Sequence, residues 1–260
     1  MQIIPNKNKL KSSAILLLFL ILGLITSCAS KKKIVYLQAE ISTKSTLEIL
    51  KYEPLIQADD ELTILVTAEN PDSAAPYNLK LATSNTNITP SQISYLIDKD
   101  GTIDFPIFGK IKLAGLTRIQ ATDKIKLLLE NDIKDPTVSI KIINFKVAVL
   151  GEVLSPGVKV IQSERITLLD ALSLAGDLTI YGKRNSIMII RELDGVRTIE
   201  KIDITKRDFM NSPYYYLAHN DIVYVEPNKT KINSSVVGPN VSVMVSILSL
   251  LITVLTLTRR

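Results

Sequence analysis

Few residues in this chain carry the side chains that catalysis requires. The 260 residues include one histidine, His219, and one cysteine, Cys28. Nucleophilic catalysis needs a serine or cysteine beside a histidine that a carboxylate orients, and a structural zinc ion needs four protein ligands. His219 lies two residues before Asp221, in what the sequence indicates is a turn into a strand. We therefore expect it on the surface or in a hairpin.

Paired carboxylates are the second chemistry to consider, because glycoside hydrolysis uses two acids that face each other. Asp59 and Asp60 are adjacent, and adjacent residues on a strand point to opposite faces. The sequence also contains no GxGxxG motif or phosphate-binding loop. We predict no catalytic residue, no metal and no cofactor, and hence no enzyme.

Regularly spaced hydroxyl groups give the clearest functional pattern, and they lie in the uncharged apolar stretch 241–258. The five hydroxyl residues between positions 242 and 256 are four, three, four and three residues apart. On a helix this spacing places them within an arc of about 80°, so one narrow polar stripe follows an otherwise aliphatic helix. The residues of this hydroxyl stripe are Ser242, Ser246, Ser249, Thr253 and Thr256.

The stretch 241–258 is predicted to be a transmembrane helix, since as a helix it would extend about 27 Å, enough for a thin hydrocarbon layer. Two partners suit its hydroxyl stripe. One is another helix, because Ser and Thr are common at packed membrane-helix interfaces and also bond to their own backbone. The other is water in the lumen of a ring of copies, with the stripe lining the pore. Eight helices of ~10 Å diameter would leave a hole about 16 Å wide.

The N-terminal residues 1–27 are predicted to be a signal peptide, with basic residues followed by the apolar run 14–24. Ile25-Thr26-Ser27-Cys28 resembles the bacterial lipobox, which implies that Cys28 is lipidated and becomes the mature N-terminus. Ala29, in place of an aspartate that retains lipoproteins in the inner membrane, implies the outer membrane. The alternative is a stray cysteine after an ordinary signal peptide.

The composition excludes nucleic acid as an expected partner. The net charge is +5, and Lys and Arg are interspersed with Asp and Glu. Nucleic-acid binding would require a clustered basic face or aromatic interleaving.

The middle of the chain is predicted to form two small β-rich modules. The first has a loop over 70–92 and a helix over 117–131 that Thr117 caps, with strands at 61–67, 91–97, 102–108 and 137–143. The second has a helix that opens at Thr167 and ends at Gly176, with strands at 145–153, 157–161, 186–192, 196–202 and 221–225.

A weak internal repeat relates the two modules. Gly109-Lys110-Ile111 with Gly115 recurs as Gly151-Glu152-Val153 with Gly157, and Asp60-Glu61-Leu62 recurs as Asp221-Ile222-Val223. The predicted class is α+β, with a C-terminal transmembrane helix. The expected divisions are 1–27, 28–51 (lipidated linker), 52–144, 145–228, 229–240 (linker) and 241–258.

The ordered motifs resemble a known family. The run 57–62 (QADDEL), Asp100-Gly101-Thr102-Ile103 and the following Phe105-Pro106 resemble the polysaccharide export domain of the Wza-type outer-membrane lipoproteins. The runs 149–153 (VLGEV), 168–171 and 220–225 (NDIVYV) resemble its soluble-ligand-binding β-grasp (SLBB) module. The resemblance covers nearly the whole mature chain. The larger members carry two such β-grasp modules, whereas this chain has one, which implies a shorter periplasmic vestibule.

The resemblance implies a homo-oligomeric, octamer-like ring whose C-terminal transmembrane helices form an oligomeric α-barrel. Capsular or exopolysaccharide would pass through this barrel across the outer membrane. The soluble modules would lie in the periplasm, and lipid would anchor each chain. An inner-membrane co-polymerase or chain-length regulator, often a tyrosine autokinase, would dock from the periplasmic side. The alternative is a monomeric anchored lipoprotein that binds glycan or peptidoglycan, with its last helix in the inner membrane and Arg259 and Arg260 in the cytoplasm.

Overall fold

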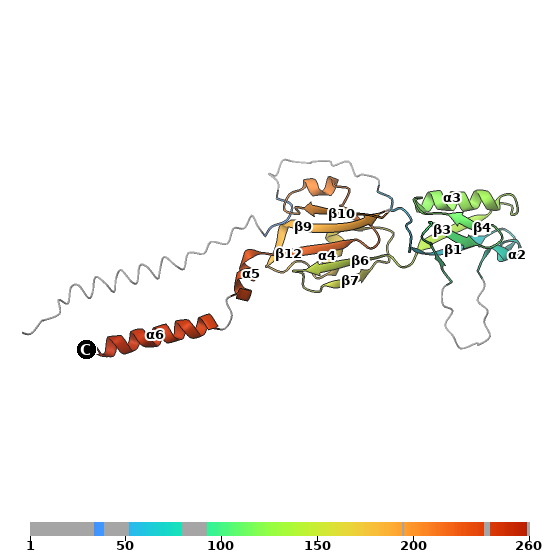
Figure 1. Ribbon diagram of the computed structural model, residues 1–260. Coiled ribbons are helices and arrows are strands. Elements are labelled where there is room, and N and C mark those ends of the chain that lie inside the picture. Colours follow the sequence, from blue (N-terminus) through green and yellow to red (C-terminus); the bar gives the residue numbers. More distant parts are fainter. Residues whose placement is uncertain (1–33, 39–51, 80–92, 194, 237–239, 259–260) are drawn as a thin grey trace, which may run out of the picture.

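A computed structural model describes residues 34–38, 52–79, 93–193, 195–236 and 240–258. Figure 1 shows two β-rich modules lying end to end, with helices α5 and α6 beyond the second module. Each module has its own hydrophobic core. The two-module α+β architecture predicted from the sequence is therefore present.

The first module is organised around β1 (Glu61–Thr67), which has the bounds predicted for it. Its apolar residues alternate, so Leu62, Ile64 and Val66 are buried while their neighbours face outward. β1 lies between β2 (Tyr95–Leu96) and β5 (Thr137–Ile142) in an antiparallel sheet. The β3 (Thr102–Phe105) and β4 (Gly109–Lys112) hairpin completes the module.

Helix α3 (Arg118–Leu129) packs against β5 and buries Ala121, Ile125 and Leu129, which are four residues apart. Thr117 caps it as predicted, because the Thr117 Oγ1 accepts the Gln120 N–H at 3.2 Å. The Gln120 side chain accepts the Thr117 N–H at 3.0 Å in return.

The second module is a five-stranded sheet in the order β10-β9-β12-β6-β7. β12 runs parallel to β6 and antiparallel to β9. Helix α4 (Leu168–Leu174), capped by Thr167, covers the sheet with Leu168, Ala171 and Leu172. The strands are β6 (Lys146–Gly151), β7 (Gly157–Val160), β9 (Gly182–Leu193), β10 (Val196–Ile202) and β12 (Ile222–Pro227), and a small ladder pairs β8 (Ile166–Thr167) with β11 (Tyr216–Leu217).

Several bounds differ from the sequence prediction. Part of the predicted loop 70–92 is helical, because Asn70 caps α2 (Pro71–Ala74) and a 3-10 turn, η2 (Ala75–Tyr77), follows. β9 begins four residues before the predicted residue 186, since Gly182 still pairs with Pro227 across a bulge. A second 3-10 turn, η3 (Asp208–Asn211), connects β10 to β11.

Residues 34–38, expected to be part of a linker, pack on the second module. The Leu37 N–H donates to the Ile204 carbonyl at 3.1 Å. The Tyr36 hydroxyl donates to Asp177 at 2.5 Å, and the Arg184 guanidinium lies 5.5 Å from the centre of the Tyr36 ring. Burial and the hydrogen bond to Asp177 raise the pKa of the Tyr36 hydroxyl above its ordinary range.

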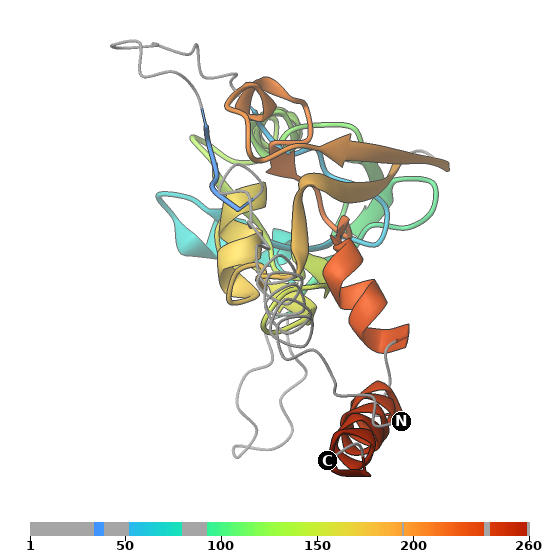
Figure 2. The same cartoon turned by 90° about the vertical axis from the view of Figure 1, so that its left-hand side faces the viewer.

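The C-terminal part contains α5 (Lys229–Val236) and α6 (Asn240–Thr258). Figure 2 shows both leading away from the body of the second module. Within the segment 229–240, expected to be a linker, residues 229–236 are helical. The Asn228 side chain accepts the Lys231 N–H at 3.0 Å at the start of α5. Over the described residues, no helix has both the length and the hydropathy that crossing a membrane requires.

Candidate functional site

Two equivalent turns meet where the modules join. Asp60 precedes β1 and Asp221 precedes β12, and each is only 1% exposed. The residue before each, Asp59 or Asn220, has a positive φ of 67° or 63°, a conformation that Asp and Asn tolerate better than most residues. In both turns the aspartate accepts the N–H three residues earlier, from Gln57 at 2.8 Å and from Ala218 at 2.7 Å. The predicted Asp60 and Asp221 repeat is therefore a structural one.

His219 belongs to the second turn, and its Nδ1 contacts the Asp60 carboxylate of the first turn. The side chain is buried, and its ring meets the Phe145 ring edge-on with centres 6.1 Å apart. The expectation of a surface or hairpin histidine is wrong, because the turn before β12 lies against the first module. Among the described residues, the His219 Nε2 has no hydrogen-bond partner.

Asp221 is paired within the second module. Arg191, on β9, donates from Nη2 at 2.7 Å and from Nε at 3.0 Å to its two carboxylate oxygens. Arg191 also donates to the Tyr216 carbonyl at 2.9 Å and lies 4.8 Å from the Tyr214 ring centre. Burial raises the pKa of the Asp221 carboxyl and Arg191 opposes that rise. The pair fixes β9 to the turn before β12.

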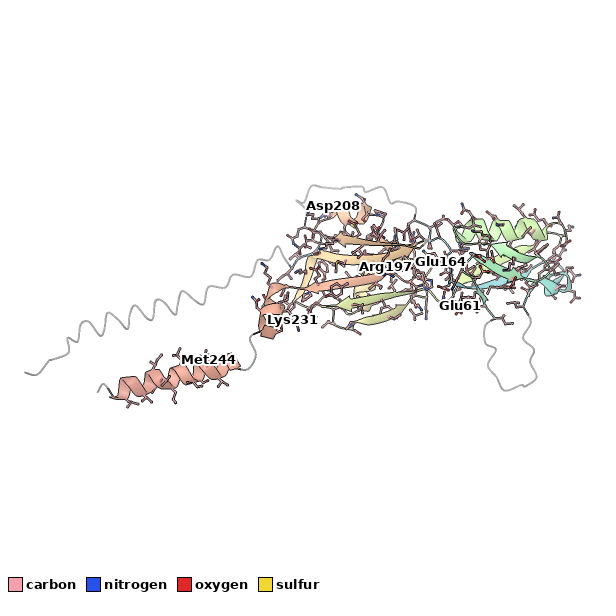
Figure 3. All side chains as sticks on the ribbon, viewed as in Figure 1. Glu61, Glu164, Arg197, Asp208, Lys231 and Met244 are labelled. Atoms are coloured by element: carbon pink, nitrogen blue, oxygen red, sulfur yellow. The ribbon has the colours of Figure 1, made fainter. Side chains whose placement is uncertain are left out.

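A cleft of about 320 Å³ lies between the modules, and we call it the junction cleft. An ion pair crosses it, with the Arg118 Nε 2.9 Å from a Glu164 carboxylate oxygen, and Figure 3 labels Glu164 at this junction. The Tyr52 ring stacks on the Tyr216 ring of the second module, with centres 4.9 Å apart and planes 7° apart. Burial raises the pKa of Tyr52. The lining comprises Tyr52, Glu53, Pro54, Arg118, Ile119, Lys141, Ile142, Phe145, Gln162, Ser163, Glu164 and Arg165.

A second and larger groove of about 960 Å³ also has walls from both modules. Residues 55–59 and the turn at Gly101 form one wall, and the β9 and β10 hairpin forms the other. Both hollows thus depend on how the modules dock.

The structure places the described part of the predicted hydroxyl stripe on α6, away from the junction (Figure 1). The Ser249 hydroxyl donates to the Ser246 carbonyl at 2.9 Å, and the Thr253 hydroxyl donates to the Ser249 carbonyl at 2.8 Å. The backbone bonding considered as an alternative is therefore present for these two groups. The side chains of Ser242 and Thr256, and the predicted lipidation site Cys28, lie outside the described residues.

The junction between the modules was not predicted from the sequence. In the described part of the chain, no three His, Cys, Asp or Glu side chains gather in a way that could hold a metal ion. The polar groups that do meet are Asp60, His219, Asp221 and Arg191. The repeated turn is the sequence signal that could have indicated these residues, because two similar turns before two core strands can pack against each other in a pseudosymmetric way.

Comparison with known proteins supports this two-module reading. Residues 50–143 match the family described as polysaccharide biosynthesis/export protein, and residues 145–225 match the SLBB domain. The EPS I polysaccharide export outer membrane protein EpsA of Ralstonia solanacearum is 27% identical over 204 residues, which cover 74% of this chain and 54% of that protein. The protein of the same name from Ralstonia nicotianae is 30% identical over 158 residues, which cover 58% of this chain and 41% of that protein.

The chain spans about half the length of these curated relatives. The matched regions follow each other almost without a gap and include both modules of the structure. The chain therefore carries a polysaccharide biosynthesis/export domain followed by an SLBB domain, which confirms the resemblance seen in its motifs.

Proposed function

We propose that this protein is a non-enzymatic component of polysaccharide export at the bacterial outer membrane. The observation that carries the proposal is the export domain followed directly by the SLBB domain. The two relatives described above are named polysaccharide export outer membrane proteins. The Asp60–His219 contact and the Arg118–Glu164 ion pair join the two domains.

The proposed location follows from the N-terminal motif. Lipidation of Cys28 would anchor the chain in the outer membrane and leave the two modules in the periplasm. An inner-membrane co-polymerase or tyrosine autokinase is the proposed partner from the opposite side.

The finer proposal concerns assembly. Copies of the chain would form a ring in which the α6 helices stand side by side and the hydroxyl stripe, Ser242, Ser246, Ser249, Thr253 and Thr256, faces a common lumen. A hydroxyl has one donor and two acceptor lone pairs, so Ser249 keeps acceptor capacity while it donates to its own backbone. Such a wall offers sugars weak and replaceable hydrogen bonds.

Deletion of the gene in its host tests the export role. We expect polysaccharide to disappear from the cell surface and medium, and the full-length gene to restore it. Unchanged surface polysaccharide would contradict the proposal and favour an anchored glycan-binding protein.

The ring is tested separately by mass measurement and electron microscopy of the purified chain in detergent. We expect a closed ring of many copies. A monomer would contradict the ring.

A further inference from the structure

The junction cleft has the size and position of a ligand site. Its volume of about 320 Å³ lies within the range of small-molecule pockets, which often form at domain interfaces. No function assigned above uses it. The first module supplies Tyr52 and Lys141 to its walls, and the second supplies Gln162, Ser163 and Arg165.

The cleft contains more positive than negative charge. Three cations and two carboxylates line it, namely Arg118, Lys141 and Arg165 against Glu53 and Glu164. Arg118 is already paired with Glu164. Among the described residues, neither Lys141 nor Arg165 forms an ion pair with a carboxylate. Two exposed cations are thus available to an anion.

The remaining wall suits a sugar ring. Tyr52 is held parallel to Tyr216, and an aromatic ring offers an apolar surface that ends in a hydroxyl. The Gln162 amide both donates and accepts hydrogen bonds. The Arg165 guanidinium lies 5.5 Å from the Tyr216 ring centre, so the same aromatic pair positions both the flat surface and a cation.

We propose that the junction cleft binds one acidic saccharide unit, with its carboxylate between Lys141 and Arg165 and its ring against Tyr52. Gln162 then bonds ring hydroxyls. The proposal deepens the proposed export function and rests on it for the source of the sugar. It requires the two modules to stay docked, because each supplies one of the cations.

Binding to the purified full chain in detergent tests this site. The probes are trigalacturonic acid and the neutral trisaccharide maltotriose. Calorimetry or saturation-transfer NMR measures their binding. We expect the wild type to bind the acidic probe at least tenfold more tightly. Lys141→Gln and Arg165→Gln should each remove most of that preference. Lys126→Gln makes the same charge change on an exposed part of α3 outside the cleft, and should leave binding unchanged.

Equal affinity for both probes, no binding of trigalacturonic acid, or an equal loss in Lys126→Gln would overturn the inference. Thermal unfolding of each variant checks that it folds, and Lys141 is an exposed strand residue whose replacement should not disturb the core. None of these outcomes bears on export, which is measured by polysaccharide release from cells. Loss of export in the deletion strain together with no binding would retain the function and remove the site.

Discussion

The imidazole of His219 contacts the carboxylate of Asp60, and the two residues lie 159 positions apart in different modules. Each belongs to the turn that precedes a core strand, β1 or β12. Equivalent turns therefore contribute to docking of the modules, in addition to the Arg118–Glu164 ion pair and the Tyr52–Tyr216 stack. A buried polar contact of this kind is specific, because either group left without its partner would be desolvated at a cost.

A double-mutant cycle measures this docking contact. Asp60→Asn keeps an acceptor for the Gln57 N–H, and His219→Ala removes the imidazole. We expect a coupling energy of roughly 0.5–3 kcal/mol, the range for residues in direct contact. Urea unfolding of the two single variants and the double variant gives the value. Asp59→Asn with His219→Ala is the control, because Asp59 is exposed, and strict additivity in the Asp60 cycle would refute the contact.

The buried pair of Arg191 and Asp221 should contribute far more to stability than an exposed pair on the same sheet. Arg191→Met leaves a buried carboxylate without its cation, and we expect a loss of about 3–5 kcal/mol in the free energy of unfolding. Arg197 pairs with Glu192 at 2.9 Å, and both side chains are mostly exposed. Arg197→Met should therefore cost less than about 1 kcal/mol. Equal urea midpoints for the two variants would show that the Arg191–Asp221 pair contributes no more to stability than the exposed pair.

Much of the fold follows from local signals in the sequence. The alternation of Leu62, Ile64 and Val66 predicts β1, and Thr117 before an apolar face predicts the start of α3. β2 is shorter than predicted because only Tyr95 and Leu96 find partners on β1, which no local pattern reveals.

The junction was less predictable. His219 is preceded by residues that pair with β8, and no local pattern indicates this pairing between segments far apart in the sequence. No residue near Arg191 in the sequence indicates that its side chain pairs with Asp221. The repeated turn predicts that Asp60 and Asp221 are equivalent, but not that the turns face each other.

Gly151 is required by the close approach of β12. Its φ is +89°, and a Cβ there would lie 2.1 Å from the Val225 carbonyl oxygen. Gly109, its counterpart in the repeat, has a φ of +69° and no atom within 4 Å of such a Cβ. Gly109→Ala should cost about 1–2 kcal/mol for the left-handed conformation alone.

Gly151→Ala should lower the free energy of unfolding by about 1–3 kcal/mol more than Gly109→Ala does, because β6 and β12 must separate. Chemical denaturation of both variants measures the difference. Similar losses would show that the backbone can move aside.

Tyr95 should make stability fall at high pH. Its side chain is buried, and among the described residues its hydroxyl has no hydrogen-bond partner. Burial raises the pKa of Tyr95 to about 12 from 10.0. Below pH 10 the tyrosine is neutral in both states, so the shift has no effect. As the pH rises from about 10 to about 12, the unfolded state loses the proton first and unfolding is favoured.

Tyr95→Phe should remove this part of the pH dependence. At neutral pH it should also raise stability by about 1 kcal/mol, because a buried unpaired hydroxyl is removed. Unfolding free energies at pH 8 and pH 11 test both effects. An unchanged slope in Tyr95→Phe would show that other tyrosines account for the loss.

Replacing hydroxyls of the α6 stripe tests the proposed lumen. In the double variant Ser246→Leu with Thr253→Leu, two of the five stripe residues, on either side of Ser249, become aliphatic. We expect surface polysaccharide to fall at least tenfold. Met244→Leu with Leu251→Met is the matched control, because these residues lie on the opposite side of the helix and the exchange retains apolar character. Its export should equal that of the wild type.

Export assays in the deletion strain need a measure of assembly beside them. If the stripe lines a lumen, the Ser246→Leu with Thr253→Leu variant should still form the detergent-stable ring yet fail to export, because water and sugar lose their bonding partners along the wall. If the stripe instead packs against a neighbouring helix, the ring itself should dissociate. Normal export from an intact ring of this variant would contradict the proposal that the stripe lines a lumen. In the wild type, the Ser249 and Thr253 hydroxyls already bond to the backbone of α6, and these bonds within the helix would then be the role of the stripe.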